Sequence, residues 1–231
     1  MASRDRLTQQ VSHLQDEILL LGQMVEQATQ KAMDSLRTRD TRLAREVYEH
    51  DLQINEKRFA IENAILILFA TQQPMARDLR QLAAMLEVST ELERMGDYAK
   101  GIAKVTLRLG TFDIPIPMQE LDDMARLSMT MLQKSLQAFV DGDHRLAMTI
   151  PQQDNEVDQL YNQVHHKLIE TMIANPETID QVNLLMWVAH NLERAADRVT
   201  NICERTVFIA TGEMMEVDYT DDESEDFPDE E

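Results

Sequence analysis

The chain has 231 residues and a formal net charge of −20, with six glycines, six prolines and a single cysteine, Cys203. The acidity argues against a nucleic-acid-binding protein, because binding to phosphates needs a basic surface. One cysteine excludes a disulfide framework and favours a reducing compartment. The N-terminus has no apolar region of a signal peptide, and the longest apolar run, Ala64 to Ala70, is too short for a bilayer. We therefore expect a cytoplasmic protein that meets a membrane only peripherally.

Helical periodicity runs through almost the whole chain, in line with the low glycine and proline content. Asp40 and Asp143 each stand where a side chain caps the start of a helix. Pro74 and Pro176 each mark the start of a further helix, where a missing N–H costs least. Six helices are predicted, over residues 5–38, 40–70, 75–109, 118–141, 143–174 and 176–212.

The two halves of the chain repeat each other. "RDTRLA" from Arg39 matches "GDHRLA" from Gly142 at an offset of 103, and "ELERMGDYAKGI" from Glu91 matches "NLERAADRVTNI" from Asn191 at an offset of 100. We interpret this as a tandem duplication of a three-helix unit. The predicted fold is all-α, with two three-helix bundles at 5–109 and 118–212, joined by a linker at 110–117 that contains two prolines.

Apolar residues in the third helix of each half step by three and four, which is typical of a coiled-coil-like seam. We expect both seams to be buried, and with them Cys203 as an unreactive structural thiol. The seams are Met85, Val88, Leu92, Met95, Ala99 and Ile102 in the first half, and Leu185, Val188, Leu192, Ala195, Val199 and Ile202 in the second.

The last segment, residues 213–231, contains eleven acids and no lysine or arginine. We expect it to be a disordered, self-repelling tail. It is either a solvated tail without a specific role or a docking peptide for a basic partner surface.

Both third helices carry Glu-Arg-x-x-Asp, with acids on a face that points away from the apolar seam. At about 100° per residue, Glu193, Asp197 and Asn201 share this face. Asp154 and Asp158 flank the apolar stripe of the preceding helix, and carboxylates four residues apart lie about 6 Å apart along the axis, a spacing that can bridge metal ions. A solvated helix face remains the alternative, but the acids recur at matched positions in both halves.

On these residues the sequence resembles the PhoU family of phosphate-signalling regulators, over about residues 5–212. The resemblance implies a six-helix, two-bundle protein. It also implies a negative regulator of the phosphate-starvation response and of phosphate uptake. The implied partners are the ATPase of the phosphate transporter and a membrane sensor histidine kinase, and the implied assembly is a homodimer.

The family's metal motif, carried over residue by residue, gives two candidate sites. The first half departs from the motif, because Gly101 stands where a ligand is expected and Asn55 is neutral. We therefore expect the second-half site to be the stronger one. The stronger set is Glu193, Asp197, Asn201, Asp154 and Asp158, and the weaker set is Glu93, Asp97, Asp51 and Asn55.

Oxygen ligands on an exposed surface favour Mg, Mn, Ca or Fe over a closed Zn site, and the identity of the divalent or trivalent ion stays open. His190 is either a further ligand or a solvated histidine, and His165 and His166 are expected at the surface. A metal-free helical scaffold is one alternative. A di-iron carboxylate enzyme is another, but it needs Glu-x-x-His motifs directed into a bundle core. With no catalytic motif in the sequence, we expect a protein that is not an enzyme.

Overall fold

The computed structural model of the chain describes residues 2–110 and 114–216. Its elements are α1 (Ala2–Thr38), α2 (Thr41–Gln72), α3 (Arg77–Leu109), α4 (Met118–Asp141), the short α5 (His144–Ala147), the 3-10 turn η1 (Pro151–Gln153), α6 (Asp154–Ala174), the 3-10 turn η2 (Pro176–Thr178) and α7 (Ile179–Thr211). The six long helices agree with the predicted all-α fold.

Two predicted helix starts are confirmed by their caps. The side chain of Asp40 accepts hydrogen bonds from the backbone N–H groups of Arg42 and Leu43, and the side chain of Asp143 accepts from those of Arg145 and Leu146. Each acid thereby satisfies amides that have no partner in the first turn of a helix.

The prediction of one continuous helix over residues 143–174 was wrong. The chain makes α5, then the 3-10 turn η1 that begins at Pro151, and only then α6. Pro151 has no N–H to donate to the carbonyl of the preceding turn, and its ring clashes with that turn. The helix therefore stops after Ala147, whereas α2 in the first half has no proline and runs unbroken over the matching stretch.

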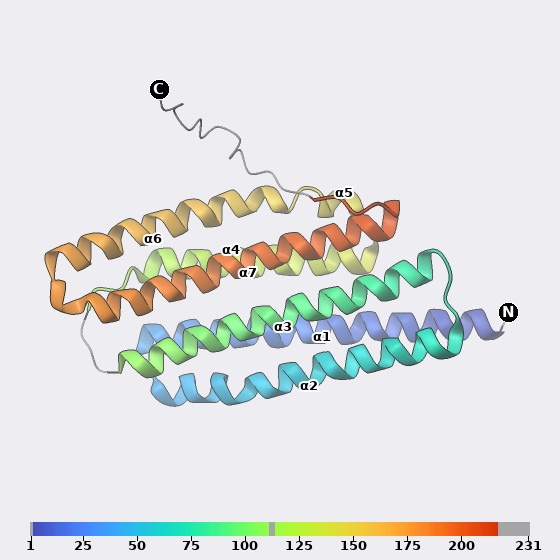
Figure 1. Cartoon of the computed structure of the whole chain (residues 1–231), viewed down its shortest axis with the longest axis horizontal. Coiled ribbons are helices and arrows are strands. Elements are labelled where there is room, and N and C mark those ends of the chain that lie inside the picture. The colour runs from blue at the N-terminus through green and yellow to red at the C-terminus, as the bar shows by residue number, and fades with distance from the viewer. Residues whose placement is uncertain (1, 111–113, 217–231) are drawn as a thin grey trace, which may run out of the picture.

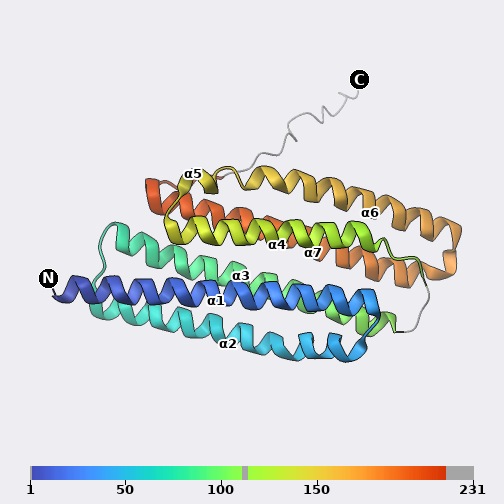
Figure 2. The same cartoon turned by 180° about the vertical axis from the view of Figure 1, so that it is seen from behind.

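The two sets of three long helices lie side by side, with their long axes roughly aligned (Figure 1). α1, α2 and α3 pack together, as do α4, α6 and α7, and the view from behind shows the same arrangement (Figure 2). α3 and α7 contact each other more extensively than any other pair of helices. The third helices of the two halves therefore form the main junction of the molecule, a packing that the sequence left open.

Both apolar seams are buried. Every residue of the two seams is at most 3% exposed. Cys203 is fully buried beside the second seam, and burial raises the pKa of its thiol to about 12. The predicted structural thiol is confirmed, since a reactive cysteine needs access and a lowered pKa.

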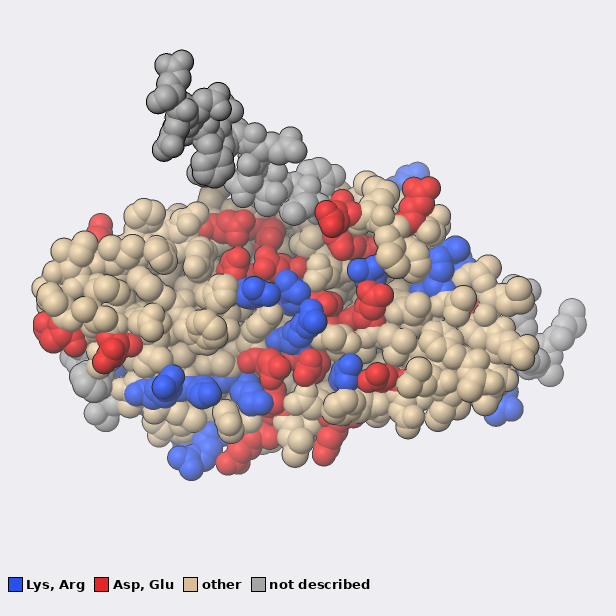
Figure 3. Space-filling model, viewed as in Figure 1, with Lys and Arg blue, Asp and Glu red and all other residues tan. Residues whose placement is uncertain are grey.

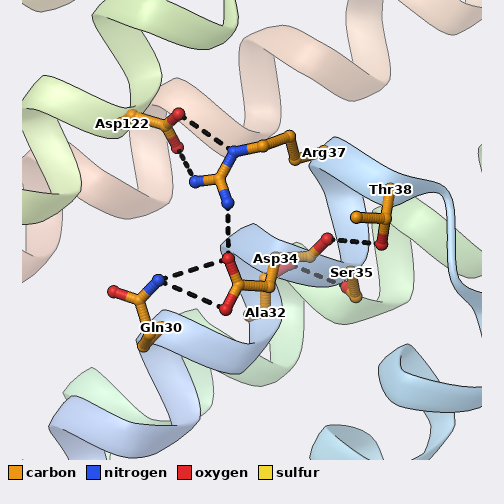
Figure 4. A network of polar contacts seen from close by, with 7 residues as sticks. All are labelled: Gln30, Ala32, Asp34, Ser35, Arg37, Thr38 and Asp122. Atoms are coloured by element: carbon orange, nitrogen blue, oxygen red, sulfur yellow. Dashed lines mark hydrogen bonds and ion pairs between the residues drawn. The ribbon is translucent and has the colours of Figure 1, made fainter.

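A polar network joins the two halves on the opposite side, where α1 contacts α4 (Figure 4). The guanidinium of Arg37 donates to both oxygens of Asp122, at 2.7 and 3.2 Å, and to Asp34 at 2.5 Å. Farther along α1, Gly22 lies against α4: a Cβ atom there would sit 2.3 Å from Leu136 Cδ1. A larger residue at this position would force the Leu136 side chain to shift, so glycine favours this close approach of the two helices.

Parts of the predicted linker and tail lie outside the described residues. Within the linker, Ile114 is buried and its carbonyl accepts a hydrogen bond from Arg39, so this part packs against the body. Residues 111–113 and 217–231 are among those the structure does not describe, so the predicted disorder of the tail stays a prediction. In the described ranges, no helix is long and apolar enough to cross a membrane.

Candidate metal centres in two duplicated acidic clusters

The duplicated acids form equivalent clusters in the two halves. Glu193 and Asp197 on α7 face Asp158 on α6, and Glu93 and Asp97 on α3 face Asp51 on α2. Figure 3 shows acidic side chains gathered over the N-terminal part of α6 and the middle of α7, and again over the middle of α3. The side chains of Glu193 and Asp197 are 25% and 35% exposed, so they lie at the rim of the bundle rather than in full solvent.

In the second-half cluster, the carboxylates repel one another. Burial, followed by the charges of Asp197 and Asp158, raises the pKa of Glu193 to about 7, although Arg194 and Arg198 act in the opposite direction. Glu193 Oε2 is buried and accepts no hydrogen bond; His190 Nδ1 lies 3.4 Å away. A carboxyl in this environment gains from either a proton or a cation.

Asp197 and Asp158 both lie close enough to Glu193 for their charges to raise its pKa, and Asp154 lies one turn before Asp158 on α6. As the side chains stand, no group of three His, Cys, Asp or Glu residues within residues 2–110 and 114–216 is arranged to hold a metal ion. The carboxylate oxygens and the negative charge of this cluster fit a hard cation. The carboxylates would have to rotate toward one another to coordinate it.

The first-half cluster already contains a cation of the protein. Lys100 Nζ lies 2.6 Å from Asp51 Oδ2 and 3.7 Å from Asp97 Oδ1. Asn55 Nδ2 donates to the same Asp51 oxygen at 3.1 Å, and Asp51 is only 5% exposed. This cluster fits a metal ion poorly, because an ammonium and an amide occupy the oxygen that would bind it.

Lys100 was missed by the analysis of the sequence, which attributed the weaker site to Gly101 and Asn55. The matching position in the second half is Thr200, which carries no charge. The signal was therefore present in the sequence as a lysine in one copy and a threonine in the other. Its meaning depends on the packing of α3 against α2, which brings Lys100 to Asp51.

Asn201 serves the junction between the halves. Its Nδ2 donates to Glu91 Oε2 on α3 at 3.2 Å, and Arg198 Nη1 lies 3.4 Å from the same oxygen. At the matching position, Gly101 leaves room for Asn191 of α7: a Cβ there would sit 2.8 Å from Asn191 Nδ2. Both positions are set by the contact of α3 with α7, and the amide of Asn201 points toward α3 rather than α6.

Three of the six histidines, His165, His166 and His190, differ in their surroundings. His166 is exposed, with Nδ1 2.7 Å from the carbonyl of Asn162, and His165 is half-buried beside the Tyr161 ring. His190 lies between Glu193 and the ring of Trp187, whose centroid is 5.5 Å from its own. Of the three, only His190 adjoins an acidic cluster.

Comparison with known proteins gives consistent matches along the chain. The sequence model of the PhoU domain matches residues 18–106 and again residues 121–206. A phosphate-specific transport system accessory protein PhoU homolog from Streptococcus pneumoniae is 33% identical over 93% of this chain and 99% of its own length. A homolog from Caulobacter vibrioides is 35% identical over 90% of each chain.

Two crystal structures share the fold. PhoU from Pseudomonas aeruginosa superposes with a TM-score of 0.83 at 29% identity, covering 89% of this chain and 99% of that one. The phosphate transport system regulatory protein PhoU from Streptococcus pneumoniae superposes with a TM-score of 0.84 at 32% identity, covering 90% and 99%.

Proposed function

The chain belongs to the PhoU domain family, and from that membership we propose that it is a non-enzymatic accessory protein of a phosphate-specific transport system. In this proposal it represses the phosphate-starvation response and moderates phosphate uptake. It acts by contact with the ATPase of the transporter and with a membrane sensor histidine kinase, and it forms a homodimer.

The observation that carries the proposal is the doubled family domain, which covers most of the chain. The relatives are named as accessory proteins of phosphate-specific transport, and the S. pneumoniae structure as a regulatory protein of that system. A relation that spans 99% of those chains makes it reasonable to extend the role from them to this protein.

A mechanism based on contact is supported by the surface. α2 exposes a series of large apolar side chains at about heptad spacing, on a helix that packs against its own bundle with the opposite face. Exposed apolar side chains grouped in this way are typical of protein–protein contacts. They are Leu52, Phe59, Leu66 and Ile67, which are 62%, 59%, 51% and 54% exposed.

We further propose that the second-half cluster binds one divalent or trivalent cation. Glu193, Asp197 and Asp158 would hold it, with Asp154 as an additional oxygen donor. A bound cation would offset the burial and the repulsion by Asp197 and Asp158 that together raise the pKa of Glu193, and it would tie α6 to α7. In the first half, the ammonium of Lys100 has this neutralising role.

The regulatory proposal is tested in the source organism with a phosphate-responsive reporter in phosphate-rich medium. Deletion of the gene should turn the reporter on, and the wild-type gene should turn it off again. A reporter that stays off after deletion contradicts the proposed repression.

The role of the metal is tested by complementing the deletion with two charge-matched variants. Glu193→Gln with Asp197→Asn should fail to restore repression, whereas Glu93→Gln with Asp97→Asn, the same changes in the other half, should restore it. If both variants restore repression, the metal-free helical scaffold is favoured instead. This scaffold is the second candidate because no group of three His, Cys, Asp or Glu side chains among the described residues is arranged to hold a metal ion.

A further inference from the structure

A groove between the two halves is lined by basic and aromatic side chains, whereas the molecule as a whole is acidic. It is formed by the C-terminal part of α3, by α6 and by the N-terminal part of α7, and its volume is about 570 Å³. Among the residues that the structure describes, no acid lines it, although the protein carries a net charge of −20. Its polar and aromatic lining is Lys104, Arg108, Tyr161, His165, Asn183, Trp187 and His190.

The two cations of the groove are available to a ligand. Lys104 and Arg108 lie one turn apart on α3, both exposed, and Figure 3 shows basic side chains in a row along this end of the helix. Neither side chain takes part in a hydrogen bond or ion pair with any other described residue. Other cations of this acidic surface, such as Lys31 and Lys167, have a carboxylate partner. Two neighbouring cations that have none among the described residues and that face one groove point to an external anion.

The aromatic side of the groove offers a surface for stacking. Trp187 is 55% exposed, and its ring is supported by His190 at a centroid distance of 5.5 Å. An exposed tryptophan beside cations suits a ligand that has one flat, apolar end and one anionic end. The volume is also within the range of about 300–1,000 Å³ that small-molecule sites occupy.

The duplication provides an internal comparison. At the matching positions of the other half, Glu204 replaces Lys104, Phe208 replaces Arg108 and Glu87 replaces Trp187. Likewise, Glu62 stands at the position that matches His165. The basic and aromatic groove is therefore specific to one end of the molecule, where the two copies have diverged in charge.

We propose that this groove binds a nucleotide, with the phosphates on Lys104 and Arg108 and the base stacked on Trp187. Inorganic phosphate alone would leave the aromatic surface and much of the volume unused. The chain's own acidic tail is a poorer occupant, because it leaves α7 at the opposite end and would pass the acidic cluster of Glu193 to reach the groove. The inference does not depend on the regulatory role or on the metal site.

The test uses the full-length protein with EDTA present, so that no metal ion bridges phosphate to the acidic clusters. Trp187 is the only tryptophan, so its fluorescence reports on this groove alone. ATP should quench it saturably, and calorimetry should give the same dissociation constant. Tripolyphosphate should bind at least about tenfold more weakly, since it lacks the base.

Two variants locate the site, and one controls for charge. Lys104→Ala with Arg108→Ala should weaken ATP binding about tenfold or more. Lys104→Glu with Arg108→Phe, which copies the other half, should abolish it. Arg45→Ala with Arg145→Ala removes two exposed cations outside the groove and should leave the affinity unchanged.

Arg108 also lies in the last turn of α3, where a cation stabilises the helix, and for that reason the readout is binding rather than stability. Absence of ATP binding at millimolar concentration would overturn the proposal, as would equal loss in the groove and control variants. Tripolyphosphate binding as tightly as ATP would overturn the assignment of a nucleotide. The assignment of a nucleotide would also be overturned if a synthetic peptide of residues 213–231 displaced ATP and bound with equal affinity.

Discussion

Replacing Lys100 with methionine tests how the first acidic cluster is neutralised. Methionine keeps the apolar stem of the side chain but removes the ammonium that lies 2.6 Å from Asp51 Oδ2. Asp51 is 5% exposed and would retain only the Asn55 amide on that oxygen. The carboxylate would then be buried without a cation, close to Asp97, whose pKa is already raised by burial and by the charge of Asp51.

Removing one partner of a fully buried ion pair costs about 3–5 kcal/mol. Here the Lys100 side chain is 32% exposed, so water screens part of the pair, and we expect a loss of about 2 kcal/mol in the free energy of unfolding. Urea denaturation followed by circular dichroism measures it. The control is Lys104→Met, one turn along the same face and without an ion pair, which should change the stability by less than about 0.5 kcal/mol.

Equal stability of the Lys100→Met and Lys104→Met variants would show that the Lys100 ammonium does not neutralise the Asp51 carboxylate. A second readout uses a chain in which Glu193 and Asp197 are already Gln and Asn. In that background, added Mn²⁺ should stabilise the Lys100→Met form, because the three first-half carboxylates are then open to a cation, and should leave the Lys100 form unchanged.

Three further predictions concern other parts of the molecule. Since the pKa of Glu193 is raised from 4.5 to about 7, the metal-free protein should lose stability relative to Glu193→Gln as the pH rises from about 4.5 to 8, by about 3 kcal/mol at most; an equal pH dependence of stability in the two proteins would contradict this. Gly22→Ala should lower stability by about 1–2 kcal/mol in thermal or urea unfolding, because the new Cβ meets Leu136, whereas a gain of about 1 kcal/mol, as helix propensity alone predicts, would show that α1 and α4 are less close. Cys203 should resist a thiol reagent such as DTNB in the native protein and react fully in denaturant, and rapid native labelling would contradict its burial and raised pKa.

The helices and their buried faces could be predicted because they depend on local patterns. The steps of three and four around Leu92 and Leu192 fix which side of each third helix is buried, and both residues are at most 1% exposed. The caps at Asp40 and Asp143 follow from the same short-range chemistry. The break at Pro151 is equally local, since a proline inside a helical pattern ends or kinks the helix.

The contents of the two clusters could not be predicted from local patterns. Whether Lys100 reaches Asp51, or the amide of Asn201 reaches Glu91, depends on how α3 packs against α2 and α7. The side-by-side packing of the halves is set by many contacts between distant residues, and a short linker permits several arrangements. The groove at Trp187 has the same origin, since its lining comes from three helices.

The most direct test of the account is the metal content of the purified protein. Elemental analysis is made on the wild-type chain, on Glu193→Ala with Asp197→Ala, and on Glu93→Ala with Asp97→Ala, each after chelation and reloading with Mn²⁺ or Fe²⁺. We expect one ion per chain in the wild type and in the first-half variant, and background content in the second-half variant. Unchanged metal content in the second-half variant, or loss confined to the first-half variant, would contradict it.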